Sequence, residues 1–533
     1  MNKFATWLTK NDKKVLAGMV GLYILIVSTA CIWKYQNFLY DGLDLAIYNN
    51  ALWNTVQGNW FWSSIQGHNY WGDHFEPILI LLLPIYYLWQ SPLMLLILQT
   101  LVLGLAAWPI YLVVKKVYPE EDLAMKNGPV LKPDYVNHNL QVSKRDPSAP
   151  PQNSRRGRSG QVAVTAIGLT LLWLINPLVH NVNLYEFHAI VFLPFFFFWL
   201  FYIYLKIKTR PSKKLFLYFY ILVFLCLMIR EDVAFIILTF LIILWLDAWK
   251  NKEKLLLRIT SYELLVTLLY LILAFKFIGH LSPSGFSPFA FYYGWLWQAN
   301  WLTAIKHLLT LTNLEMVLGF LAPFFFLPVI KPRWLLISVI PLAQIILSAA
   351  GGGAQVWQIH YGALFLPALM IAFIYAWPRA NEASARYFKD QRILFLIIVL
   401  FNLALWPNFG PVARQNKIAD RQTVKTMLEQ IEPDASIMAS FRLLPNLSSR
   451  KEIYSLHYYF LGVQQFAQAE YILDRDPEYI LMDKDDYQYF DDILKTSAWA
   501  GAYYDRGYQR LGQLLSNYQK MEEAKTISLW QKN

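Results

Sequence analysis

The sequence predicts a polytopic α-helical membrane protein with a small α/β domain at its C-terminal end. Of its 533 residues, 56% are hydrophobic and only 16% are charged, whereas soluble domains carry about 25% charged residues. Apolar runs of about 17 residues or more, long enough to cross a bilayer as a helix, recur up to residue 407. Basic residues gather between alternate runs, which is typical of cytoplasmic loops.

The alternation of apolar runs and basic clusters predicts about eleven crossings, with the N-terminus in the cytoplasm. The predicted helices are 15–33, 92–114, 161–178, 189–206, 215–229, 233–249, 262–280, 316–330, 334–350, 361–377 and 393–407. A shorter apolar run, 77–89, predicts a re-entrant or outer-leaflet helix. Residues 1–409 would thus form the transmembrane domain, and the Pro- and Ser-rich segment 118–160 a disordered cytoplasmic insertion.

The C-terminal segment 410–533 has no apolar run that could span a membrane. Short strand-like runs, 436–440 and 479–483, alternate in it with helical ones, which favours a small α/β domain. An odd number of crossings places this domain outside the cytoplasm.

Charge and cysteine content exclude two classes of function. The net charge of +11 lies in the short loops rather than on one face, so it follows the membrane topology and does not predict nucleic-acid binding. Cys31 and Cys226 both lie in apolar segments, which argues against a disulfide framework or a thiolate metal site.

The outer loop 34–76 contains carboxylates and histidines but no basic residue between Lys34 and Lys115. Apolar residues recur every three or four positions from Asp41 to Gln57, which predicts a surface helix. Further ionisable residues are predicted at the outer ends of helices, where such groups are costly unless they line a site. The set is Asp41, Asp44, His74, Glu76, Glu186, His188, Arg230, Glu231, Asp232 and His360.

Each of these residues also has a structural interpretation. Asp41 and Asp44 are placed to cap the surface helix. His74 and Glu76 precede Pro77 and could only solvate a helix start, and the run 230–232 could neutralise itself. The tryptophans of the loop fit an interfacial aromatic belt, although such rings also stack on sugars.

Several motifs resemble an uncharacterised bacterial family of polytopic membrane proteins, the domain of unknown function 2079. They are DLAIYNNALWNTVQG at 44–58, HFEP at 74–77, FH at 187–188, ED at 231–232, HY at 360–361 and LSSR at 447–450. That family is similar in layout to the C-type (GT-C) glycosyltransferases. Its pattern Asp-Leu-Gly is Asp-Leu-Ala here, at 44–46.

The resemblance implies a GT-C-like fold in the bacterial cytoplasmic membrane and an enzyme that moves a sugar from a polyprenyl-phosphate donor to an extracytoplasmic acceptor. Asp44, with Asp41 second, would be the catalytic carboxylate. The residues implied in substrate binding are His74, Glu76, Glu186, His188, Arg230, Glu231, Asp232, His360 and Tyr361. The chemistry needs a base for the acceptor proton and cations for the departing phosphate.

The predicted partners are the lipid-linked donor and membrane lipid, and no nucleic acid. No cofactor is required; a divalent metal held by Asp44, Glu76 or a histidine would have mixed oxygen and nitrogen ligands. Two other classes of function stay open, a transporter or lipid flippase with helices broken at prolines, and a non-enzymatic scaffold. Charges at one face and the lack of an internal repeat favour the enzyme.

Overall fold

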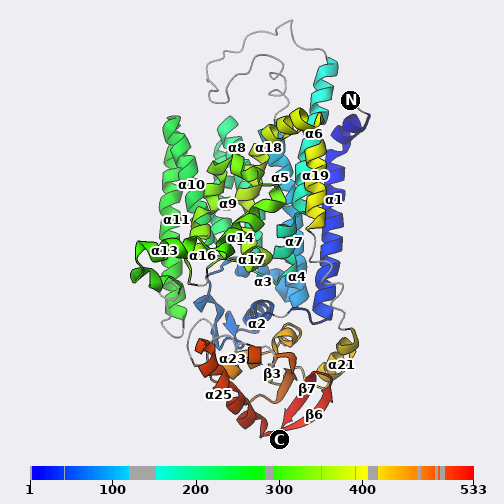
Figure 1. The fold of residues 1–533 in the computed structure, drawn as a ribbon, viewed down its shortest axis with the longest axis vertical. Helices are drawn as coiled ribbons and strands as arrows, with labels where there is room; N and C mark the ends of the chain where they lie inside the picture. The colour runs from blue at the N-terminus through cyan, green and yellow to red at the C-terminus, as the bar shows by residue number, and fades with distance from the viewer. Residues whose placement is uncertain are drawn as a thin grey trace.

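The computed structural model describes residues 3–40, 42–118, 152–282, 292–349, 351–390, 392–405, 418–464, 470–473, 475–486, 490–492 and 498–533. A tall bundle of helices forms most of the molecule, and a small sheet domain lies below one end of it (Figure 1).

Within the described ranges, five helical stretches are long and apolar enough to cross a membrane, or up to seven if each of two bent pairs counts as one span. The five are Trp7–Gln36 in α1 (Lys3–Gln36), Pro92–Val117 in α4 (Pro92–Leu105) and α5 (Ala107–Val117), Ala189–Thr209 in η3 (Ala189–Val191) and α8 (Phe192–Thr209), α10 (Val233–Lys250), and α11 (Lys254–Leu281). The bent pairs are α6 (Gln152–Leu174) with α7 (Pro177–Leu184), and α13 (Trp301–Leu308) with α14 (Leu311–Leu321) and η5 (Ala322–Phe324).

The structure therefore supports a membrane protein with five to seven candidate spans. Other predicted apolar segments form helices that are too short or not apolar enough to count as a span: α3 (Ile78–Leu88), α9 (Lys213–Leu227), α18 (Leu366–Phe388) and α19 (Arg392–Ala404). The predicted helix 334–350 is divided into shorter elements, α15 (Pro332–Leu335), η7 (Leu336–Ser338) and α16 (Val339–Leu347). Proline accounts for part of the difference, because it removes a backbone donor and starts a new helix, as Pro177 does at the 41° bend before α7. Hydropathy alone does not reveal such breaks.

One boundary differs from the prediction. Helix α6 begins at Gln152, inside the segment 118–160 that the sequence predicted as disordered. Gln and Arg are good helix formers, so the basic run before the apolar segment can extend the helix instead of ending it. Residues 119–151 of that insertion lie outside the described residues.

The two ends of the bundle differ in what covers them. Lys115, near the end of α5, binds Asp12, near the start of α1, with 3.1 Å between Nζ and Oδ2. The opposite end carries α2 (Asp44–Val56) and then the sheet domain (Figure 1). The groups predicted to share the outer face do gather at this second end, while its orientation toward the outside of the cell stays a prediction.

The C-terminal sheet has five strands in the order β4-β3-β5-β7-β6. Strand β3 (Ile437–Ala439) pairs in parallel with β4 (Ile453–Ser455) and β5 (Tyr479–Asp483), and the antiparallel strands β7 (Ile527–Lys532) and β6 (Tyr518–Ala524) complete the sheet. Helices α21 (Ile418–Glu429), α22 (Leu444–Leu447), α23 (Leu456–Leu461) and α25 (Ala498–Leu515) belong to the same region. The α/β composition predicted for this segment is present.

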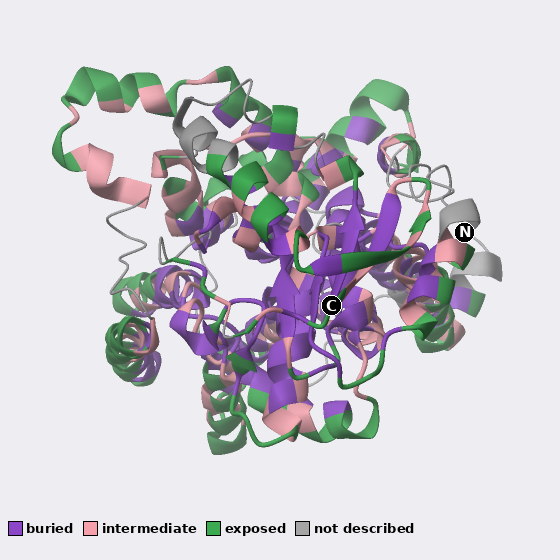
Figure 2. Ribbon diagram, turned by 90° about the horizontal axis from the view of Figure 1, so that it is seen from below, coloured by how far each residue is buried: buried purple, intermediate pink, exposed green. Residues whose placement is uncertain are grey.

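Helix α2 joins the sheet domain to the bundle. The amide of Asn49 donates to the hydroxyls of Ser448 and Ser449, and the amide of Asn50 donates to the carbonyls of Ser448 and Arg450. Tyr86, from α3, donates to the Asn49 side-chain oxygen at 2.7 Å. Viewed from this end, buried residues lie at the centre and exposed ones toward the rim (Figure 2). Helix α2, which the sequence predicted to lie on the surface, is thus largely buried and connects the sheet domain to the bundle.

Candidate functional site

The start of helix α2 is held by Glu186 rather than by Asp44. The buried Glu186 carboxylate accepts the backbone N–H of Gly42 at 2.7 Å and that of Leu45 at 2.8 Å. A negative charge at a helix N-terminus is favourable, because the backbone donors there have no partner within the helix. Glu186, predicted to bind substrate, therefore orients the helix, and Asp44 is not needed as its cap.

Asp44 is the first residue of α2, and its carboxylate contacts His188 at 3.0 Å between Oδ2 and Nε2. His188 is buried, whereas the Asp44 side chain is 37% exposed. Burial opposes ionisation of Asp44, but the charge and hydrogen bond of His188 outweigh it and hold the pKa of Asp44 below its usual value. Asp44 therefore presents an ionised carboxylate that is supported from behind. Asp41 lies outside the described residues.

His360 completes a three-residue cluster at this point. Its ring stacks on the ring of His188 with centroids 3.5 Å apart and planes at 18°. Burial, followed by electrostatic interactions with His188, Arg230 and His74, lowers the pKa of His360 well below its usual value, so its ring is neutral. One donor atom each from Asp44, His188 and His360 lies within 4.8 Å of the others.

This donor set has the residue types for a divalent cation but not the orientation. An imidazole binds a metal through a lone pair in the plane of its ring. Two nearly parallel rings at 3.5 Å cannot both direct that lone pair at one ion, so His360 would first have to turn. Glu76, named in the prediction as another ligand, is engaged elsewhere.

Glu231 positions His74. One carboxylate oxygen contacts Nδ1 of His74 at 2.8 Å, and the other accepts the backbone N–H of Phe75 at 2.9 Å. Burial opposes protonation of His74, but the charge and hydrogen bond of Glu231 outweigh it and raise the pKa of His74 to about 9. His74 is therefore an imidazolium at neutral pH, and its side chain is 46% exposed.

Arg230 is bound by Asp232 in a two-point contact from Nε and Nη2 to the two carboxylate oxygens. The guanidinium lies 5.8 Å from the ring centroid of Tyr361, within cation–π range. A guanidinium has five N–H groups, so donors remain beyond those that Asp232 takes. Asp232 thus orients Arg230, whereas Glu231 serves His74.

Glu76 is completely buried between two tyrosines, with the hydroxyls of Tyr48 and Tyr70 donating to its two oxygens at 2.9 Å each. Burial raises the pKa of Glu76 to about 7. Sequence reasoning missed both tyrosines: it placed Tyr48 on the apolar helix face and gave Tyr70 no role. The only available signal was a carboxylate in an otherwise apolar stretch, which needs donors once it is buried.

The structure brings Asp44, His188, His360, Tyr361 and Arg230 together, and places the pair Glu231 and His74 within electrostatic range of them. Most members are buried, while Asp44, His74 and Tyr361 are partly exposed, at 37%, 46% and 36%. The arrangement combines the partly exposed carboxylate of Asp44 with two cations. His74 is partly exposed, and the buried Arg230 has N–H donors left for a hydrogen bond. Such a set can accept a proton and stabilise an anionic leaving group.

The family comparison agrees with the class of protein. The model of the family described as "Predicted membrane protein (DUF2079)" matches residues 34–128 and 154–508. The chain belongs to this family. No curated protein sequence matches it. The matched range includes every described member of the cluster and the C-terminal region up to residue 508, and it ends before strands β6 and β7.

Proposed function

We propose that this family member is a glycosyltransferase that moves a sugar from a polyprenyl-phosphate donor to an acceptor hydroxyl at the α2 end of the bundle. The observation that carries the proposal is the Asp44 carboxylate, ionised and partly exposed at the start of a helix whose other residues are largely buried. A short acid held in one position by a buried histidine is suited to act on a bound substrate.

In the reaction, the acceptor oxygen forms a bond to the anomeric carbon while the bond from that carbon to the donor phosphate breaks. The electron pair of the broken bond leaves with the polyprenyl phosphate. Asp44 takes the acceptor proton and later releases it to water. Attack makes the acceptor O–H strongly acidic, so even a carboxylate with a lowered pKa can accept its proton, and the carboxylate stays ionised at physiological pH.

The departing phosphate needs positive charge beside it. His74 supplies an exposed imidazolium, whose second ring nitrogen remains available after Nδ1 contacts Glu231. Arg230 supplies a guanidinium held in one orientation by Asp232, which suits a phosphate through paired N–H donors. In this assignment Glu231 and Asp232 are positioning residues.

The deciding experiment compares Asp44→Asn with the wild type. The full chain in nanodiscs is incubated with a panel of synthetic polyprenyl-phosphate sugars, and released lipid phosphate and transferred sugar are measured. Loss of a base typically costs about 10²–10⁴ in rate. Asn keeps the size of the side chain, so Asp44→Asn should stay folded, with a small fall in unfolding temperature from the lost pairing with His188, and lose transfer to that extent.

Asp247→Asn is the matched control, because Asp247 pairs with Arg333 toward the far end of α10 and should leave transfer unchanged. Turnover of Asp44→Asn at the wild-type rate would remove Asp44 as the base. Absence of transfer by the wild type with every lipid-linked donor would overturn the proposed function.

A further inference from the structure

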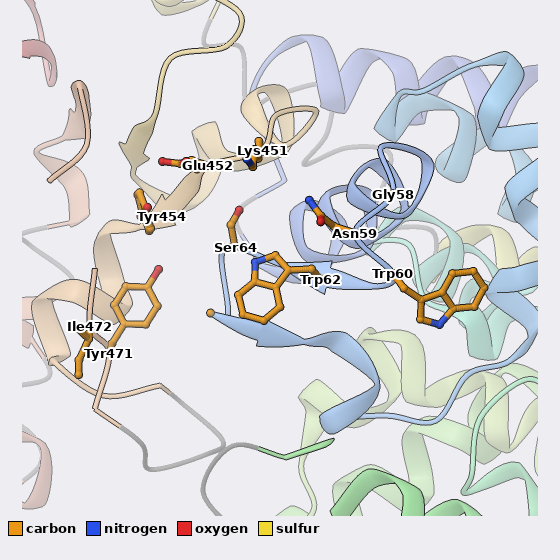
Figure 3. A pocket seen from close by; sticks show the side chains of 11 residues that line it. Gly58, Asn59, Trp60, Trp62, Ser64, Lys451, Glu452, Tyr454, Tyr471 and Ile472 are labelled. Carbon is orange, nitrogen blue, oxygen red and sulfur yellow. The ribbon is translucent and has the colours of Figure 1, made fainter. Parts of the chain in front are cut away.

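A hollow lies between the loop 34–76 and the C-terminal sheet domain. It has a volume of about 580 Å³. The loop contributes Trp60 and Trp62, and the sheet domain contributes Lys451, Glu452, Tyr454 and Tyr471 on the other side (Figure 3). We propose that this cleft binds the carbohydrate acceptor, an oligosaccharide chain; this rests on the proposed function.

The lining has the chemistry of a carbohydrate site. Trp60 and Trp62 are 51% and 40% exposed, although large aromatic side chains usually bury most of their area. An aromatic ring has a negative face, which attracts the polarised C–H groups of a sugar ring. Asn59, Ser64 and Glu452 add amide, hydroxyl and carboxylate groups around these rings, which suit the hydroxyls of a sugar.

The two tryptophans are held in place by the backbone between them. Phe61 has a φ of 46°, a left-handed conformation that bulky residues rarely adopt. Its ring is completely buried and stacks on Trp71 with centroids 4.5 Å apart. The short hairpin of β1 (Trp62–Ser63) and β2 (His68–Asn69) follows directly. Strained conformations persist where the surroundings fix them, often at ligand sites.

The two sides of the cleft are fixed to one another. Ile453 donates its backbone N–H to the hydroxyl of Ser64, and the hydroxyl of Tyr471 donates to the carbonyl of Ile65 at 3.0 Å. A cleft formed by two chain segments far apart in sequence is thus preorganised, which lowers the entropic cost of binding a flexible chain.

The cleft is also connected to Asp44 through α2. The side-chain oxygen of Asn50 accepts both the backbone N–H and the hydroxyl of Ser64, which lines the cleft. Asn50 follows Asp44 by six positions on the same helix, a rise of about 9 Å along the axis. The cleft therefore borders the C-terminal end of the helix whose first residue is Asp44, so an oligosaccharide must extend along α2 to reach the proposed catalytic carboxylate.

The test measures direct binding of oligosaccharides in the absence of the donor. An array of neutral and acidic chains of hexoses and pentoses first identifies the class that binds, and isothermal titration calorimetry then measures its affinity. The full chain is kept in nanodiscs, because maltoside detergents would compete for a carbohydrate site. At least one class should bind, and Trp60→Ala and Trp62→Ala should each weaken it about tenfold or more. Trp62→Phe keeps a ring and should retain much of the affinity.

Trp297→Ala and Trp301→Ala are matched controls, because both tryptophans are more exposed than those of the cleft, at 79% and 76%, and neither lines it. Equal binding by Trp62→Ala and the wild type, or no binding across the array, would overturn the inference. The two proposals fail separately. Asp44→Asn should still bind the oligosaccharide, and binding without any transfer would refute the enzyme while keeping the cleft.

Discussion

The two ends of the helix bundle both carry buried charges, but an acid exposed over a buried histidine occurs at the α2 end. At the α5 end, the acids Asp12 and Asp247 are only 11% and 19% exposed, and the exposed members are the long cations Lys115 and Arg333, at 39% and 47%. At the α2 end the Asp44–His188 pair has the reverse order, since Asp44 is 37% exposed over a His188 that is 6% exposed. The His74–Glu231 pair at the same end keeps the order of the α5 end, at 46% and 8%.

This reversal separates anchoring from chemistry. A long lysine or arginine can cover apolar surface with its stem and keep its charge in water, so it needs no fixed position. An aspartate has a short side chain, and one that is backed by a buried partner holds its carboxylate in one place. Ionisable groups near a membrane are costly unless they serve a site. The fixed, partly exposed carboxylate at the α2 end therefore supports the proposed reaction site, whereas the α5 end has the properties of a set of paired anchors.

The comparison is tested most sharply by determining on which side of the membrane the α2 end and the α5 end of the bundle lie. Thr209→Cys, at the end of α8, and Met521→Cys, on the exposed strand β6, provide accessible thiols, while the native Cys31 and Cys226 are buried. An impermeant thiol reagent should label whole cells only through the second variant, because basic loops stay inside. Labelling only the first would place the site in the cytoplasm and exclude the assigned acceptor side.

The sequence was sufficient to predict the class of the fold and the strand Tyr479–Asp483, because hydropathy and alternation are local properties. The sequence also indicated Asp44, His188, His360, His74 and Glu231 as site residues. It did not show which of them act on a substrate and which position a neighbouring side chain. Only packing over 141 positions of the chain shows that Glu186 binds the Leu45 N–H, and so caps α2 rather than binding substrate. Helix breaks and the two tyrosines around Glu76 likewise depend on tertiary contacts.

The next largest effect concerns Glu186, which we expect to act through Asp44 rather than on substrate. Glu186→Ala removes the acceptor of two backbone N–H groups, and a hydrogen bond to a charged group contributes about 1.5–3 kcal/mol. Thermal unfolding in nanodiscs should move to clearly lower temperature, and transfer should fall because the start of α2 loses its support.

Gly42→Ala tests the same contact from the other side, since an added Cβ would lie 2.4 Å from a Glu186 carboxylate oxygen. Gly42→Ala and Glu186→Ala should both lower the unfolding temperature. Glu186→Gln keeps one acceptor oxygen, so its unfolding temperature should lie between those of the wild type and Glu186→Ala. Full stability together with lost donor binding in Glu186→Ala would instead assign Glu186 to the substrate.

The smallest effect is a dependence on pH that only the α2 end should show. The pKa of His74 is raised from its usual 6.5 to about 9 by Glu231. The contribution of this pair to folding is therefore complete below pH 6.5 and is lost as pH rises through about 9. Donor affinity should fall over the same pH range, the alkaline limb of the profile, because the imidazolium that is proposed to face the phosphate is lost there. The KM for the lipid-linked donor, measured from pH 6 to pH 10, should rise severalfold at the alkaline end.

Glu231→Gln removes the carboxylate that raises the pKa of His74, so the alkaline limb should move toward pH 6.5 while the imidazole ring remains. His74→Gln should remove the limb and give a raised KM at every pH. If the limb stays near pH 9 in Glu231→Gln, another group titrates there, and His74 belongs with the paired anchors of the opposite end.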